Sequence, residues 1–298
     1  MVSVFMLTYN HEKYIRQAIE SILMQKVNFR YEIVIGEDAS PDGTRHIVQE
    51  YARKYPDIVR AYCRKKNIGA IRNSISTFKK CTGKYIAFLE GDDFWNDENK
   101  LQTQIDFLEK NLAYSMCFTD VDMIKDYAVR DFYAKKDIEN VEQLLGDRKR
   151  VLCIPTATLV CRNYFKTEPE LYRYFKGLNI VGDRITHAIM MKRGKAKYIP
   201  MKSATYRRIT RGGDSFSSST TRVRYDDMIR AYKNCMNMYG LRYFHLWMKH
   251  IAGGYKSLFQ WLRKNEGIGA AIKEYIFKTD IVEKIYTLKG LIEVLYED

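Results

Sequence analysis

The hydrophobic positions of this chain change period repeatedly over the first 120 residues. Runs of β-branched and aromatic residues predict four strands, at 2–7, 31–35, 58–63 and 85–89. Between and after them, apolar residues recur every three or four positions, which is typical of amphipathic helices. Four helices are predicted in this way. The first is capped by Asn10, the second lies near 44–55, the third carries Arg72 and the fourth begins at about Asp97. The alternation predicts an α/β fold with a mostly parallel sheet and right-handed crossovers.

The periodic pattern weakens after residue 120. Short strands are predicted at 151–154, 158–161 and 197–200, and a helix at 183–191. The Gly- and Ser-rich stretch 212–221 is typical of a mobile loop, whereas the chain from about Arg222 onward has the pattern of helices. The chain therefore divides into an α/β part and a helical C-terminal extension.

The composition excludes several classes of protein. Of the 298 residues, 46% are hydrophobic and only 5 are proline, which indicates a folded globular chain. No run of about 18 apolar residues predicts a membrane-spanning helix. The first residues lack the basic and apolar regions of a signal peptide, so we expect a cytoplasmic protein. The six cysteines show no CxxC spacing, so we expect reduced thiols and no zinc site.

One segment provides almost all of the net charge of +14. Residues 184–256 contain 16 Lys and Arg but only 3 Asp and Glu. Such a segment is expected to meet an anionic partner, for example a diphosphate, a lipid surface or a nucleic acid. A solvated basic face without a partner is the alternative interpretation.

Polar residues follow three of the predicted strands, at 8–10, 37–38 and 90–93. Ligands of open parallel sheets bind at the carboxyl ends of the strands, so these residues would face a ligand together. Adjacent carboxylates repel each other unless a cation or a sugar hydroxyl lies between them. One acidic residue at a strand end is often only a helix cap. Three such ends predict a pocket for a nucleoside diphosphate with a bound metal ion.

Four segments, in this order, resemble the bacterial family 2 glycosyltransferases of the GT-A fold. They are VSVFMLTYNHEKYIRQAIESIL, EIVIGEDASPDGT, NIGAIRNS and GKYIAFLEGDDFW, within about the first 110 residues. Leu7 replaces a proline common in the family, and Gly36-Glu37 stands where a hydrophobic residue and Asp are usual. The resemblance implies a GT-A catalytic domain at 1–212 and a basic loop with helices at 213–298. Residues 1–120 would bind the nucleotide sugar, and 121–212 would face the acceptor.

The resemblance also implies roles for individual residues. The nucleotide-binding residues would be Thr8, Tyr9, Glu12, Asp38, Arg72 and Asp92. Among them, Tyr9 would stack on the base, Asp38 would bind the base edge, and Asp92 would contact the ribose or the sugar. Asp93 would be the carboxylate ligand of Mn²⁺ or Mg²⁺, a hard cation that shares its shell with phosphate oxygens and water.

The catalytic base is expected downstream, and the segment NIVGDRITHAIMMK matches the family's pattern at Asp183. Attack by an alcohol on the anomeric carbon needs a carboxylate that takes the hydroxyl proton. An N-cap of the helix at 184–191 is the alternative role for Asp183, and His187 is expected to be structural. Cations near the leaving diphosphate would lower the barrier. The family's basic loop is matched by Arg207, Arg208 and Arg211.

The resemblance predicts an inverting, metal-dependent glycosyltransferase. It would move a sugar from a UDP-sugar to a saccharide or lipid-linked acceptor, in the assembly of a cell-surface polysaccharide such as capsule or O-antigen. A non-catalytic GT-A-like subunit of a membrane-associated synthase complex is the alternative. Nucleic-acid binding is discounted because no recognised motif is present and the acidic pocket would repel a polyanion. A sugar-phosphate nucleotidyltransferase is discounted because residues 8–12 are not a Gly-rich phosphate loop.

Aromatic residues are interleaved with basic residues between 222 and 264. They fit a helix that lies peripherally on an anionic membrane surface at the inner face of the membrane. Aromatic residues at helical spacing are equally typical of a helix packed on the protein core, so both interpretations stay open.

Overall fold

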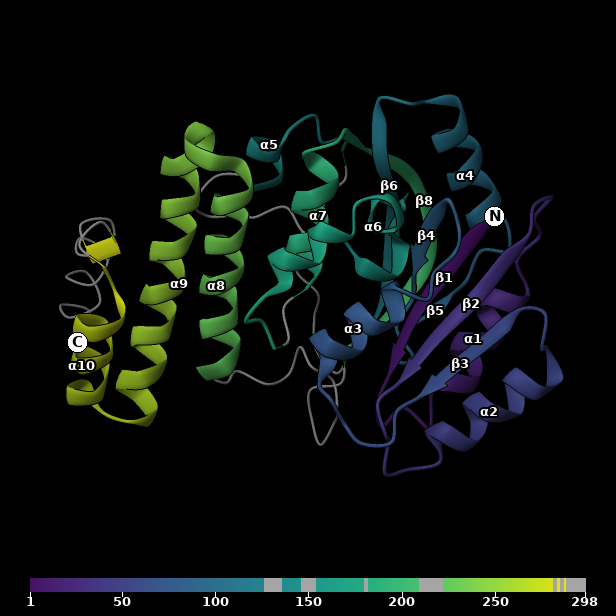
Figure 1. Cartoon of the computed structure of the whole chain (residues 1–298), viewed down its shortest axis with the longest axis horizontal. Helices are drawn as coiled ribbons and strands as arrows, with labels where there is room; N and C mark the ends of the chain where they lie inside the picture. Colours follow the sequence, from purple (N-terminus) through teal and green to yellow (C-terminus); the bar gives the residue numbers. More distant parts are fainter. Residues whose placement is uncertain are drawn as a thin grey trace.

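The computed structural model describes residues 1–125, 136–145, 154–179, 182–208, 222–280, 283, 284 and 287. Its centre is an eight-stranded sheet in the order β3-β2-β1-β4-β7-β6-β8-β5 (Figure 1). The strands are β1 Val2–Thr8, β2 Tyr31–Glu37, β3 Val59–Cys63, β4 Tyr85–Phe88, β5 Phe94–Trp95, β6 Tyr114–Lys125, β7 Val160–Arg162 and β8 Lys195–Arg208. The first four predicted strands are thus present, together with the α/β fold.

The sheet is mixed rather than mostly parallel beyond β4. Strands β3, β2, β1 and β4 are parallel, as the repeated strand–helix pattern predicts. Strand β7 then runs antiparallel to both β4 and β6, and β5 runs antiparallel to β8. The sequence did not predict β6, because the polar residues Ser115, Thr119 and Asp120 interrupt its hydrophobic run. The expected strand at 151–154 lies mostly outside the described residues.

Helices cover both faces of the sheet and extend it at one end. They are α1 Ile15–Leu23, α2 Thr44–Lys54, α3 Ala70–Phe78, α4 Lys100–Lys110, α5 Val141–Leu145, α6 Tyr164–Thr167, α7 Asp183–Met191, α8 Arg222–Tyr239, α9 Phe244–Asn265 and α10 Ile268–Lys278. Short 3₁₀ turns lie at Thr156–Thr158, Pro169–Phe175 and Gly240–Tyr243. Each of the four helices predicted in the first 120 residues is present, and so is the one at 183–191. The expected cap is wrong, however, because Tyr14 and not Asn10 precedes the first turn of α1.

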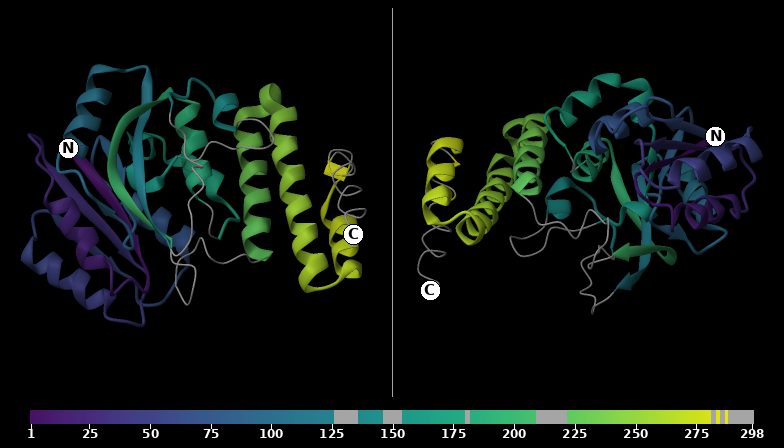
Figure 2. Two further views of the ribbon diagram at one scale, coloured as in Figure 1. Left: turned by 180° about the vertical axis from the view of Figure 1, so that it is seen from behind. Right: turned by 90° about the horizontal axis from the view of Figure 1, so that it is seen from below.

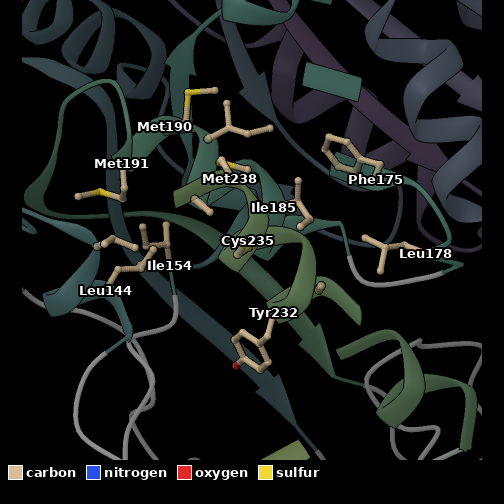
Figure 3. Close-up of a cluster of buried hydrophobic side chains, with 14 of the residues drawn as sticks. Leu144, Ile154, Phe175, Leu178, Ile185, Met190, Met191, Tyr232, Cys235 and Met238 are labelled. Carbon is tan, nitrogen blue, oxygen red and sulfur yellow. The ribbon is translucent and has the colours of Figure 1, made fainter. Parts of the chain in front are cut away.

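Two hydrophobic cores form on opposite faces of the sheet, because successive strand residues point to opposite sides. On one face, Val4 and Met6 pack with α1, α2 and α4. On the other, Phe5 and Phe88 belong to a cluster that continues through α3 and α7 into α8 and α9. Figure 3 shows part of this cluster, where Phe175, Leu178 and Ile185 lie opposite side chains of α8. The helical C-terminal part therefore shares a core with the sheet.

Helices α8, α9 and α10 form a row that leads away from the sheet (Figures 1 and 2). Trp247, Tyr255 and Phe259 of α9 are all buried, and Trp261 packs partly against the same core. Of the two interpretations of these aromatic residues, core packing is the one that their burial favours. Among the described helices, none is both long and apolar enough to cross a membrane.

The cysteines that the structure describes are all unpaired, as expected for reduced thiols: Cys63, Cys81, Cys117, Cys161 and Cys235. Cys153 lies outside the described residues.

Candidate active site

Three carboxylates gather where β4 ends. One oxygen each of Glu90, Asp92 and Asp93 lie within 4.8 Å of one another. Asp93 is only 2% exposed, Asp92 is partly exposed, and Glu90 is open to solvent. Gly91 allows the turn that brings them together, because a Cβ there would lie 2.6 Å from Thr8 Oγ1. A side chain at this position would thus push the cluster away from β1.

The crowding of these carboxylates disfavours their charged forms. Surrounding protein, together with the charges of Asp92 and Asp183, raises the pKa of Glu90 to about 8. Although solvent reaches Glu90, protein encloses it on most sides, and this enclosure is the largest cause. Burial, followed by the charges of Asp92 and Glu90, raises the pKa of Asp93 well above its usual range. The site therefore has an unmet demand for positive charge.

Arg207 of β8 is the buried cation beneath this cluster. Its backbone N–H donates to Asp93 Oδ1 at 2.8 Å, and its guanidinium donates to the carbonyl of Asp92 at 2.6 Å and to Gln17. The guanidinium also lies 4.5 Å from the ring centre of Phe94. The sequence left open whether Arg207 or Arg208 points inward. Arg207 points inward and is 9% exposed, whereas the side chain of Arg208 and all of Arg211 lie outside the described residues.

The residues at this site fit a hard divalent cation. Asp92 Oδ1 is buried and has no hydrogen-bond partner among the described residues, which is costly for a carboxylate oxygen unless a cation satisfies it. The other oxygen of Asp92 lies 4.0 Å from His11 Nε2. Asp93, by contrast, uses Oδ1 to accept the Arg207 N–H. The oxygen-only set Glu90, Asp92 and Asp93 suits Mn²⁺ or Mg²⁺.

The residues predicted to bind the nucleotide lie at the ends of β1 and β2 and on α3. Tyr9 is 43% exposed at the end of β1, as a ring that receives a base requires. Thr8 is buried, and its hydroxyl lies 3.3 Å from His11 Nδ1. Arg72 is exposed on α3.

Asp38 already has protein partners. Its two carboxylate oxygens accept the backbone N–H groups of Ile68 and Gly69, each at 2.9 Å. The side chain is buried, with 4% exposed. In this structure the residue joins the loop after β2 to the loop before α3. A carboxylate has further lone pairs, so these two bonds leave acceptor capacity for a base edge.

Glu12 also joins two loops. Its Oε2 accepts the N–H of Gly43 at 3.0 Å, and its own N–H donates to Asp42. The side chain is otherwise exposed. Both Glu12 and Asp38 thus hold the nucleotide-side loops in fixed relation to each other.

Asp183 is the first residue of α7. Gly182, not Asp183, occupies the N-cap position, so the alternative of Asp183 as the N-cap is wrong. The carboxylate is exposed, and Oδ1 accepts the N–H of Arg184 at 2.8 Å. Its charge acts on Glu90, which associates the start of α7 with the cluster after β4. One turn later, His187 is buried and burial lowers its pKa to about 4, as expected for a structural residue.

With this geometry established, comparison with known proteins decides the family. The sequence profile of the family described as glycosyl transferase family 2 matches residues 3–198. The chain belongs to glycosyl transferase family 2.

Two curated relatives illustrate the family's range. An uncharacterized protein of Mycobacterium tuberculosis is 30% identical over 217 residues, which cover 71% of this chain and 60% of the relative. A putative teichuronic acid biosynthesis glycosyltransferase of Bacillus subtilis, TuaG, is 34% identical over 116 residues, 39% of this chain and 45% of TuaG. The chain thus spans about half to two thirds of the length of these relatives.

Solved structures agree on the fold. TarS of S. aureus, residues 1–349 in complex with UDP-GlcNAc, superposes with a TM-score of 0.67 at 18% identity, over 97% of this chain and 79% of TarS. The mannosyltransferase PcManGT of Pyrobaculum calidifontis, in complex with GDP-Man and Mn²⁺, gives a TM-score of 0.58 at 15% identity, over 99% of this chain and 81% of that one. This family 2 chain therefore has the GT-A fold.

Sequence reasoning left three residues of the site without a role. Glu90 joins the cluster, and its position at the strand end with Asp92 and Asp93 was a usable signal. His11 lies between Thr8 and Asp92, two residues beyond Tyr9. Gln17 holds the guanidinium of Arg207, and nothing in the sequence of this family 2 chain points to that contact.

Proposed function

We propose that this chain is a metal-dependent, inverting glycosyltransferase that uses a nucleotide sugar, and specifically a UDP-sugar. The observation that carries the proposal is the arrangement of four carboxylates. Glu90, Asp92 and Asp93 form a group that demands a cation, and the exposed Asp183 acts on that group from the start of another element, α7. A single displacement needs charge stabilisation for the leaving group, which a cation held by the carboxylate group would supply, and a base that takes the proton of the acceptor hydroxyl.

In this proposal, Asp183 accepts the proton of an acceptor hydroxyl. The hydroxyl oxygen forms a bond to the anomeric carbon from the face opposite the diphosphate, and the bond from that carbon to the diphosphate oxygen breaks. The electron pair leaves with the nucleoside diphosphate, so the configuration at the anomeric carbon inverts. A cation held by Asp92 and Asp93 would supply charge neutralisation for the departing diphosphate. Tyr9 and Asp38 would hold the base, and Arg72, Arg208 and Arg211 stay predictions as further contacts.

The acceptor proposed is a saccharide or a lipid-linked saccharide in the assembly of a cell-surface polysaccharide. TuaG, named for teichuronic acid biosynthesis, supports this setting by relationship. The cytoplasmic location and contact with an anionic membrane are part of the same hypothesis. Burial of the α9 aromatic side chains means that such contact would need other residues.

A thermal-shift panel tests the proposal. The protein is heated with UDP, GDP, UDP-sugars and GDP-mannose, each with and without Mn²⁺, and transfer by the best donor is then assayed on saccharide acceptors. We expect metal-dependent stabilisation by UDP, strongest with one UDP-sugar. Stabilisation by GDP alone would keep the enzyme and overturn the UDP assignment. Donor binding without turnover on any acceptor would favour the non-catalytic subunit, and no stabilisation at all would overturn the proposal.

A further inference from the structure

One face of α8 is bonded to the segment that leads to Asp183. Asp227, Arg230 and Asn234 lie at helical spacings of three and four residues, so their side chains emerge on the same side of α8. All three reach into residues 174–179, which end four residues before Asp183. Helix α8 belongs to the C-terminal extension, so this contact joins the extension to the acceptor-facing half.

Asp227 makes the most buried of these contacts. It is 1% exposed, and its carboxylate accepts the backbone N–H of Asn179 at 2.7 Å and the side-chain amide of Asn179 at 3.0 Å. Hydrogen bonds to a charged group are worth more than neutral ones, and a buried pair of this kind fixes the chain in one place. Asn179 is therefore held at both its backbone and its side chain.

Two further side chains of α8 bind backbone carbonyls of the same segment. Arg230 donates to the carbonyl of Gly177, and Asn234 donates to those of Tyr174 and Lys176. Gly177 has φ +78°, and a Cβ there would lie 2.7 Å from the Arg230 guanidinium. The backbone turns at this glycine so that it can meet α8 closely.

The other side of the segment meets the nucleotide-binding half. The carbonyl of Asn179 accepts the N–H of Ile71, at the start of α3, at 3.4 Å. A Cβ on Gly182 would lie 3.1 Å from Ile71 Cδ1, so the residue before Asp183 rests against α3 as well. Hydrophobic packing continues the contact, because Phe175, Leu178 and Ile185 share a cluster with Tyr232 and Cys235 of α8 (Figure 3).

We propose that Asp227 is a positioning residue, through which α8 fixes the place of the Asp183 carboxylate relative to the donor site. The inference rests on the proposed function, in which Asp183 is the base. Asp227 touches neither substrate nor metal; it acts through Asn179. The C-terminal helices are then part of the catalytic unit on the acceptor side, while donor binding depends on β1, β2 and β4.

The test compares Asp227→Ala with two matched controls. In Asp227→Asn, the new amide oxygen still accepts the Asn179 N–H, and its NH₂ donates to Asn179 once that amide rotates. Asp226→Ala removes the neighbouring carboxylate, which pairs with Arg222 of the same helix. The measurements are kcat and donor KM with the best donor, and the dissociation constant of UDP with Mn²⁺. A catalytic group displaced by about 1 Å loses up to about 100-fold in rate, so we expect kcat of Asp227→Ala to fall about 10- to 100-fold.

The donor constants separate positioning from general damage. We expect the donor KM and UDP dissociation constant of Asp227→Ala to stay within about twofold, and both controls to keep kcat within about threefold. An unchanged kcat in Asp227→Ala, or an equal loss of UDP binding, overturns the inference. If Asp227→Ala does not fold, the exposed Arg230→Met replaces it: a several-fold lower kcat with unchanged UDP binding supports the inference, and an unchanged kcat overturns it. A wild-type protein without donor binding or transfer would overturn the proposed function itself, whereas an active wild type with unaffected variants overturns only the role of Asp227.

Discussion

In the proposed function, this molecule has a nucleotide side and an acceptor side, and the two satisfy their polar groups in different ways. On the nucleotide side, the loops after β1 and β2 are bonded to each other and to α3, and Asp38 and Glu12 already have backbone partners. At the centre, Glu90, Asp92 and Asp93 repel one another, and Asp183 adds its charge from the acceptor side. The proposed nucleotide side is thus a preformed frame of loops that are already bonded to each other. The carboxylate cluster, by contrast, holds like charges close together, and a bound cation would neutralise their repulsion.

The largest expected effect tests the acceptor side of this contrast. Removing a general base lowers reaction rates by about 10²- to 10⁴-fold, so we expect the kcat of Asp183→Asn to fall by a factor in that range. The exposed position of Asp183 should leave the fold and the UDP affinity unchanged. Steady-state transfer kinetics with calorimetric UDP binding measure both. Full activity of Asp183→Asn would mean that the base is another group.

The second effect distinguishes the two aspartates of the cluster. Asp92 has an unpartnered buried oxygen, whereas Asp93 accepts the Arg207 N–H, which an Asn at that position can also do. We expect Asp92→Asn to lower kcat/KM by about 10²- to 10³-fold, the usual loss of an electrostatic contact to a leaving group. For Asp93→Asn, we expect the fold loss in kcat/KM to be about a tenth of that or less.

To compare Asp92→Asn with Asp93→Asn, the transfer activity and the thermal stability of each variant are measured at increasing Mn²⁺ concentrations. Glu98→Gln is a matched control, because Glu98 is exposed and pairs with Lys26 away from the cluster. If Asp93→Asn needed more Mn²⁺ than Asp92→Asn, the main metal ligand would be Asp93, as the family resemblance implies.

The same contrast explains what could be predicted from the sequence. Strands β1 to β4 and helices α1 to α4 follow from local patterns, whereas the two-residue strand β5 was not predicted. The helix at 183–191 was predicted with the bounds observed for α7. Strand β6 was missed because polar residues such as Ser115, Thr119 and Asp120 interrupt the kind of hydrophobic run that identified β1, β2 and β4. Strand β7 was predicted at 158–161 and lies at Val160–Arg162, but its antiparallel direction depends on pairing with β4 and β6, which no local pattern reports.

The sequence indicated candidate residues for the site but not the contacts that they make. Strand ends and family motifs gave Asp92, Asp93 and Asp183. The inward direction of Arg207 depends on where β8 pairs with β5, which only the folded sheet decides. Likewise, Asp38 meets backbone groups 30 residues away, and Asp227 meets Asn179 across 48 residues. Such pairings are tertiary, so no local pattern reports them.

A smaller effect tests whether the nucleotide side is a preformed frame. Asp38→Ala leaves the N–H of Ile68 without its acceptor, at a cost of about 1–3 kcal/mol, whereas the N–H of Gly69 keeps its bond to Asn67 Oδ1. We expect Tm to fall by roughly 2–4 °C for each kcal/mol, even without nucleotide. Differential scanning calorimetry of the ligand-free protein measures this, with the exposed Asp57→Ala as control. A loss of UDP binding with an unchanged Tm would show that Asp38 serves the base alone.

The smallest effect concerns the repulsion at the centre and its pH dependence. In the folded protein the pKa of Glu90 lies at about 8, above its ordinary value of 4.5. The folded state therefore holds this proton more tightly than the unfolded state, and stability is lost as pH rises from about 4.5 to 8.

The substitution Glu90→Gln removes that loss of stability. Because solvent screens part of the repulsion, we expect a gain in Tm of only about 2–4 °C above pH 8. The gain should shrink toward pH 5, and it should also shrink when Mn²⁺ and UDP neutralise the cluster. Melting curves between pH 5 and 9 measure it, and a gain that is equal at every pH would mean that Glu90 is not held protonated by its neighbours.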